Sequence, residues 1–145
     1  MRIAIGADHG GYEFKLQLIQ WLKSRDIEYR DFGTDSPGSC DYPDFGIPAA
    51  KSVSEGECGL GILICNNGIG MSILANKIRG IRAALVYNED TARATKEHHD
   101  SNVLCLGGQE FSSDQLLRFV EIWLKSEYVG ERHQRRIHKI SELEK

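Results

Sequence analysis

Strand-like and helix-like segments alternate along the sequence, and this alternation restricts the possible folds more than any other feature. Five apolar runs indicate strands at residues 2–6, 27–32, 61–65, 81–86 and 102–106. Segments of helical periodicity separate them at 10–25, 45–54, 70–78, 90–98 and 112–125, and a basic helix is expected at 130–144. The pattern predicts a three-layer α/β sandwich, in which a five-stranded parallel sheet carries helices on both faces.

The bulk composition agrees with one domain over residues 1–145 and excludes several classes of partner. The chain has 41% hydrophobic and 27% charged residues, and its net charge is −3, which gives no basic field for nucleic acid. No apolar run approaches the roughly 20 residues that span a bilayer. The N-terminus becomes polar too soon for a secretory signal, so we expect a cytoplasmic protein.

The four cysteines do not form a metal or redox motif. They lie at positions 40, 58, 65 and 105, and none forms a Cys-x-x-Cys pair. A reducing compartment disfavours disulfides. The cysteines are therefore core residues or include a catalytic thiol, and their spacing gives no indication of a metal or a cofactor.

Ligands of open parallel sheets bind beyond the carboxyl ends of the strands, and this rule selects candidate site residues. The first strand leads into Asp8 and His9, and the third ends at Cys65. The fifth strand follows His98 and His99 and leads into the segment Gly107-Gly108-Gln109. Asp8 and His9 have a simpler interpretation as a helix cap and a loop histidine.

The stretch Cys-Asn-Asn-Gly-Ile-Gly, residues 65–70, is the most informative loop. Asn67-Gly68 suits a hairpin turn, but the apolar strand before it and the helical pattern after it favour a strand–loop–helix connection. A dinucleotide motif is incomplete because Ile73 replaces its third glycine, and no P-loop is present. The loop therefore indicates a general cradle of backbone N–H groups for an oxyanion or a phosphate. Cys65 beside it is either a base or nucleophile or a buried core cysteine.

Basic side chains supply the remaining signals. His98 and His99 fit a helix end, and a metal site is disfavoured because adjacent helical residues do not face each other. Arg132 and Arg136 are four residues apart, so they share a helix face that matches a phosphate, or they belong to a solvated basic helix. A thiol, an oxyanion cradle, histidines and an arginine pair together suit proton abstraction beside a carbonyl of a phosphorylated sugar.

Several motifs resemble the type B ribose 5-phosphate isomerase family, which also contains galactose 6-phosphate isomerase subunits. They are IAIGADHGGYEFK at the N-terminus, DYPDF at 41–45, GILICNNGIGMSILANKIRGIRAAL at 61–85, HHDSNVLCLGG at 98–108 and GERHQRRI at 130–137. The resemblance covers nearly the whole chain in order. It implies a Rossmann-like sandwich that forms dimers or tetramers with metal-free active sites between subunits.

The resemblance also implies a role for each candidate residue in ribose 5-phosphate–ribulose 5-phosphate interconversion, a step of the pentose phosphate pathway. Cys65 would move the proton between C1 and C2 through an enediolate, and His98 would open the sugar ring. The remaining residues would bind the sugar phosphate: Asp8, His9, Tyr42, the backbone amides of Asn66, Asn67, Gly68, Ile69 and Gly70, then His99, Gln109, Arg132 and Arg136.

Four residues depart from the family pattern and leave other functions open. Asn66 and Asn67 replace a glycine and a hydroxyl residue, His99 replaces an asparagine, and Gln109 replaces an arginine. Gln109 raises a hexose 6-phosphate isomerase of the galactose or allose type as an alternative. The missing hydroxyl at position 67 raises a catalytically weak sugar-phosphate-binding protein, and the fold class alone would also suit a flavodoxin-like electron carrier.

Overall fold

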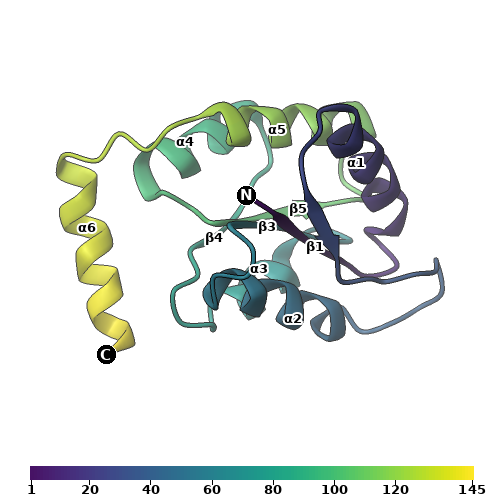
Figure 1. The fold of residues 1–145 in the computed structure, drawn as a ribbon, viewed down its shortest axis with the longest axis horizontal. Helices are drawn as coiled ribbons and strands as arrows, with labels where there is room; N and C mark the ends of the chain where they lie inside the picture. The colour runs from purple at the N-terminus through teal and green to yellow at the C-terminus, as the bar shows by residue number, and fades with distance from the viewer.

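A computed structural model describes residues 1–145 as a three-layer α/β sandwich (Figure 1). The strands are β1 (Ile3–Ala7), β2 (Tyr29–Asp31), β3 (Leu60–Cys65), β4 (Ala83–Leu85) and β5 (Val103–Gly107). The helices are α1 (Tyr12–Ser24), α2 (Pro43–Ser54), α3 (Ile69–Ala75), α4 (Glu89–His99), α5 (Ser113–Lys125), α6 (Arg132–Ser141) and the 3₁₀ turn η1 (Glu142–Glu144). All strands run parallel in the order β2-β1-β3-β5-β4. The predicted fold class is therefore confirmed.

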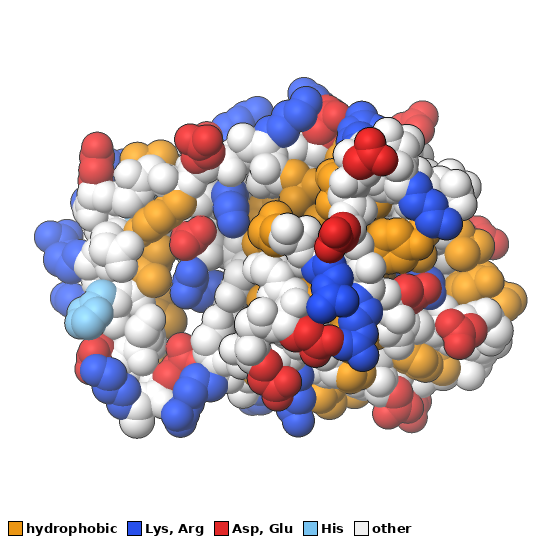
Figure 2. All heavy atoms as spheres, viewed as in Figure 1, with side chains coloured by type: hydrophobic (Ala, Val, Ile, Leu, Met, Phe, Trp, Pro, Cys, Tyr) orange, Lys and Arg blue, Asp and Glu red, His pale blue; other side chains and the backbone are white.

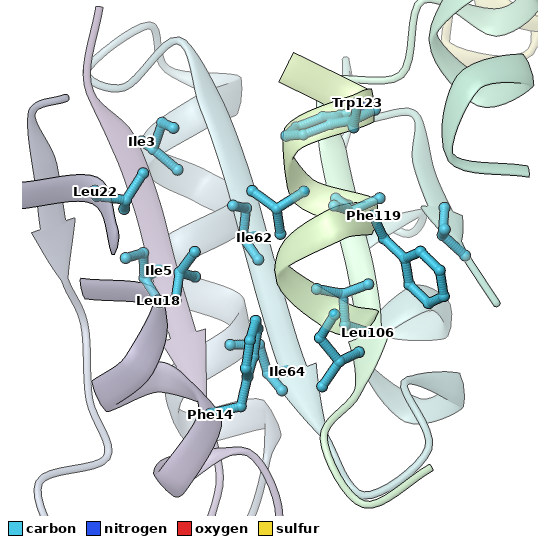
Figure 3. Packing of buried hydrophobic residues seen from close by; sticks show 14 of the residues in the cluster. Ile3, Ile5, Phe14, Leu18, Leu22, Ile62, Ile64, Leu106, Phe119 and Trp123 are labelled. Atoms are coloured by element: carbon cyan, nitrogen blue, oxygen red, sulfur yellow. The ribbon is translucent and has the colours of Figure 1, made fainter. Parts of the chain in front are cut away.

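The sheet is buried on both faces because successive side chains point to opposite sides of each strand. Ile62 and Ile64 of β3 belong to a core under α1 and α5, whereas Leu63 and Cys65 belong to a second core under α2 and α3. Figure 3 shows the first core, where Leu106 and the isoleucines of β1 and β3 pack against side chains of α1 and α5. This alternation directs the Cys65 side chain toward the α2–α3 layer.

The predicted helices are present, with two instructive shifts in their ends. α2 begins at Pro43 rather than at residue 45, since proline is well suited to the first turn of a helix. α3 ends at Ala75 rather than at residue 78, because Lys77 and Ile78 donate to carbonyls only three residues back. The side chain of Asn76 then pairs with both backbone groups of Ala83, at 2.9 Å each, and covers the free edge of β4.

The basic helix at the C-terminus is confirmed, but it stands apart from the sandwich. α6 contacts α4, where His133 stacks on His98, and its buried side chains are His133 and Ile137. The backbone N–H of Val129 joins the two segments by donating to Glu97 O at 2.9 Å. Figure 1 shows α6 as an arm at one end of the molecule. No helix is long and apolar enough to cross a membrane.

Candidate active site

The loop after β1 brings Asp8 and His9 to the carboxyl edge of the sheet. Asp8 is buried, and its Oδ1 accepts hydrogen bonds from the N–H groups of Gly10 at 2.8 Å and Gly11 at 3.3 Å. This pairing fixes the turn into α1 and leaves Oδ2 without a partner in the chain. His9 is exposed, and its Nδ1 accepts from the backbone N–H of Cys40 at 3.2 Å, so the imidazole is held by the loop before α2.

Cys65 ends β3 at the same edge and is only 5% exposed. Its carbonyl accepts from Gly108 N at 2.8 Å, and the carbonyl of Asn66 accepts from Gln109 N at 3.1 Å. These bonds join the loop after β3 to the loop after β5. The predicted strand–loop–helix connection is therefore present, and Cys65 belongs both to the core and to the site edge.

The loop of residues 66–70 presents unpaired backbone donors. Gly68 adopts a left-handed conformation, φ +80°, where glycine is favoured. The N–H of Ile69 donates to Asn67 Oδ1 at 3.1 Å, while those of Gly68, Gly70 and Met71 have no partner in the chain. Because α3 has only seven residues, these individual N–H groups, rather than a long helix dipole, make the cradle.

Tyr42 closes the cradle from the side of α2. A Cβ atom added to Gly70 would lie 2.5 Å from Tyr42 Cζ and 2.9 Å from its hydroxyl oxygen, so the phenol ring lies directly against Gly70. Gly10 approaches the loop in the same way, since its Cβ would lie 2.9 Å from Asn66 N. Tyr42 and the turn after Asp8 therefore lie against the loop that follows Cys65, while His9 contacts Cys40.

Gln109 is at this edge but is already engaged. Its Nε2 donates to Gly10 O at 2.9 Å, which ties the loop after β5 to the loop after β1. A cavity of about 220 Å³ lies on the β4 side of the loop, where Asn67 and Ile69 meet Tyr87 and Phe111.

The remaining predicted residues form a second group at the opposite edge of the sheet. His98 and His99 end α4, and Arg132 and Arg136 are exposed on α6. β3 and β5 pair in parallel from Gly61↔Val103 to Cys65↔Gly107, so the histidines that precede β5 lie at its amino end. The strand-end rule predicts His98 and His99 in one site with Cys65, but a single chain does not bring these residues together. In a pair of parallel strands, a residue that precedes one strand and a residue at the carboxyl end of the other lie at opposite edges of the sheet.

Two residues that sequence reasoning missed organise this second group. His133 stacks on His98, and burial, followed by the charges of Arg132 and His98, lowers the pKa of its imidazole. Arg82 donates to the carbonyls of His99 at 2.9 Å and Asp100 at 2.8 Å and so holds the end of α4. The sequence signal for His133 is its four-residue spacing from Ile137, which indicates that the two side chains share a buried helix face.

A groove of about 780 Å³ adjoins the second group, between residues 76–84 and the α6–η1 segment. Apolar side chains, including Ile78, Ile140 and Leu143, line it together with basic ones. Thr95 also lines the groove, and its buried hydroxyl has no hydrogen-bond partner. Figure 2 shows basic side chains over the α6 end of the molecule and hydrophobic ones on its side toward the body.

The fold is that of a Rossmann-like α/β protein, a class whose ligands bind beyond the carboxyl ends of the strands. A family model described as Ribose/Galactose Isomerase matches residues 3–140. The chain is 38% identical to ribose-5-phosphate isomerase B of Escherichia coli, over 99% of this chain and 96% of the relative. The chain belongs to the ribose/galactose isomerase family and is an isomerase.

Solved structures agree with this assignment. Ribose-5-phosphate isomerase B of Clostridium thermocellum has a TM-score of 0.97 at 49% identity, covering 99% of this chain and 97% of that one. The Mycoplasma genitalium enzyme, solved with bound ribulose-5-phosphate, has a TM-score of 0.95 at 38% identity, covering 99% and 95%.

Proposed function

We propose that this chain interconverts ribose 5-phosphate and ribulose 5-phosphate through an enediolate, in the cytoplasm and as part of the pentose phosphate pathway. The observation that carries the proposal is the position of Cys65 beside the unpaired N–H groups of Gly68, Gly70 and Met71. The C–H next to a sugar carbonyl is a weak acid, so its removal needs a base and oxyanion donors in one place. The type B isomerase names of the relatives support the same reaction.

Cys65 is the proposed base that takes the proton from C2 and returns it to C1. The backbone donors stabilise the charge that develops on the substrate oxygen, and removing one such donor typically costs about 100-fold in rate. Cys105 does not compete for this role. Burial, followed by the nearby Cys65, raises the pKa of the Cys105 thiol far above its ordinary value, so it stays neutral.

Asp8 and His9 are proposed to bind the sugar hydroxyls at the same edge. Asp8 Oδ2 is free to accept a hydrogen bond, and the Cys40 N–H leaves His9 with Nε2–H as its donor. His98 is proposed to open the furanose ring, with His99 beside it, and Arg132 and Arg136 to hold the phosphate.

A complete site then requires two chains, and we propose a homodimer in which each chain completes the other's site. Within one chain Cys65 and His98 lie at opposite ends of the paired strands β3 and β5. The groove beside α6 exposes Ile140 and Leu143, while α3 exposes Ile69 and Ile73. A second copy whose α3 enters the groove would bury these apolar groups and bring its own Cys65 toward His98 and the arginines.

The second candidate is a hexose 6-phosphate isomerase. Gln109 favours it, because its side chain bonds Gly10 O and adds no positive charge for a pentose phosphate. A third possibility, a sugar-phosphate-binding protein with weak turnover, is suggested by the asparagine at position 67, which has no hydroxyl.

One assay separates these functions. The purified protein is given ribose 5-phosphate, ribulose 5-phosphate, allose 6-phosphate and galactose 6-phosphate, and kcat/KM is measured for each. The proposal requires the highest kcat/KM for the pentose pair. A higher value for a hexose phosphate would select the second candidate, and binding of all four without turnover would select the third.

A further inference from the structure

The proposed isomerisation moves two hydrogens, and Cys65 accounts for only one of them. In the aldose, C1 is a carbonyl carbon and C2 carries a hydrogen and a hydroxyl; in the ketose these roles are exchanged. The C2 hydrogen therefore moves to C1, and the proton on O2 moves to O1. Backbone N–H groups stabilise charge on these oxygens but do not carry protons between them. Another group must do so, an inference that rests on the proposed function.

Side chains of the loop itself do not supply this group. Asn67 has no hydroxyl, and its carbonyl oxygen already accepts from Ile69 N at 3.1 Å. An amide can donate a hydrogen bond, but it does not release its proton near neutral pH. The hydroxyl of Ser72 donates to Ile69 O at 2.8 Å inside the helix, so it is engaged as well.

Tyr42 presents the one hydroxyl that lies against the cradle and is unpaired. Its oxygen would lie 2.9 Å from a Cβ atom on Gly70, and it makes no hydrogen bond within the chain. The side chain belongs to the residue that caps α2, and the N–H of Gly46 donates to its backbone carbonyl at 2.9 Å. The phenol is thus placed by a helix start and by contact with Gly70, a residue whose N–H has no partner.

We propose that Tyr42 is a catalytic residue whose hydroxyl relays the proton between O2 and O1 in place of a hydroxyl at position 67. When Cys65 takes the C2 proton, the C–H electron pair forms the C1–C2 double bond. The carbonyl pair moves to O1, which receives the Tyr42 proton. The phenolate then takes the proton from O2 as the C2 carbonyl forms, and C1 takes its proton back from Cys65. Both residues end in their starting protonation states.

The test compares kcat and KM for ribose 5-phosphate in the wild type, Tyr42→Phe, Asn67→Thr and the double variant. Phenylalanine keeps the ring against Gly70 and removes only the hydroxyl, so a packing role would leave kcat intact. A proton relay is worth on the order of 100-fold, so Y42F should lose about that factor in kcat with little change in KM. N67T returns a hydroxyl to the cradle, so the double variant should recover at least about tenfold.

The outcomes divide cleanly. A Y42F variant with wild-type kcat, or one whose loss lies in KM alone, overturns the relay and leaves the isomerase assignment intact. A kcat loss that N67T does not restore assigns Tyr42 to substrate geometry and also overturns the relay. A wild-type protein without turnover on any sugar phosphate removes the proposed function and this inference together.

Discussion

The imidazoles of His98 and His133 lie face to face, with ring centroids 4.4 Å apart and planes 11° apart, although His98 belongs to α4 and His133 to α6. This stack links the side chains of the arm and the body at the end of α4. Arg132 and Arg136 belong to the same helix as His133, so the stack also fixes where their backbone lies relative to α4. The positions of the proposed ring-opening and phosphate-binding groups therefore depend on each other.

Acid should weaken this link. Burial and the neighbouring cations lower the pKa of His133 below its ordinary value of 6.5, so the folded state prefers the neutral imidazole. As the pH falls below 6.5, the unfolded state binds a proton that the folded state does not bind. The free energy of unfolding therefore falls. His133→Phe keeps a ring in the stack and removes the titrating group. Between about pH 7.5 and about pH 5.5, its Tm should therefore decline less than that of the wild type.

Thermal unfolding of both proteins at the two pH values measures this difference. His138, exposed on the same helix, supplies the control His138→Phe, which should leave the acid sensitivity in place. An equal decline in the wild type and the His133 variant would contradict the prediction.

Subunit complementation should reveal the two-chain site. Cys65→Ala and the double variant Arg132→Ala/Arg136→Ala should each be inactive alone. Random re-assembly of an equal mixture makes about half of the dimers mixed, each with one intact site, so about a quarter of wild-type activity should return. The assay is kcat per subunit after unfolding and refolding the two variants together. Activity that stays at the level of the separate variants would place all catalytic residues in one chain.

Cys65 should be indispensable for turnover and dispensable for folding. Replacing a general base typically costs 10²–10⁴-fold, so Cys65→Ser should lose at least about 100-fold in kcat. Cys58, buried in the same core cluster away from the loop, supplies the control Cys58→Ala, whose kcat should stay near that of the wild type. Full activity in the Cys65 variant would exclude the thiol as the base.

Gly70 should tolerate no side chain. Its Cβ would meet the Tyr42 ring at 2.5 Å, so Gly70→Ala must displace the phenol or the loop. Displacements of about 1 Å in a catalytic site can cost about 100-fold, and kcat/KM should fall toward that factor. Gly38→Ala is the matched control, because the nearest atom to its Cβ is Ser36 Oγ at an ordinary 3.5 Å. Equal kcat/KM values for the two variants would contradict the contact.

Lys15 should hold the loop that carries Tyr42. Its Nζ, on a side chain only 2% exposed, bonds both Asp31 oxygens at 2.8 and 2.9 Å and Thr34 O at 2.6 Å. Lys15→Met leaves these acceptors unpaired, and because Asp31 is partly exposed we expect a loss of about 1–3 kcal/mol in the free energy of unfolding. Urea denaturation measures it, with the exposed Lys23→Met as the control; a change under about 0.5 kcal/mol would contradict the prediction.

The sequence determined the layers of the fold and one edge of the site. The apolar runs and the helical periods are local patterns, and chain chirality restricts how parallel strands connect, so the sandwich follows from them. Asp8, Cys65 and the 66–70 loop could be found because Cys65 ends a strand, Asp8 and the loop directly follow strands, and parallel strands share a carboxyl edge.

Only the tertiary structure decided which groups meet across elements. The His98–His133 stack, the Cys40 contact to His9 and the Tyr42 ring on Gly70 join residues far apart in the chain. It also separated His98 from Cys65, since His98 precedes β5 and Cys65 ends β3, which puts them at opposite ends of these paired strands. Periodicity fixes which face of an element is buried, but the register between elements depends on side-chain packing and hydrogen bonds that no local pattern encodes.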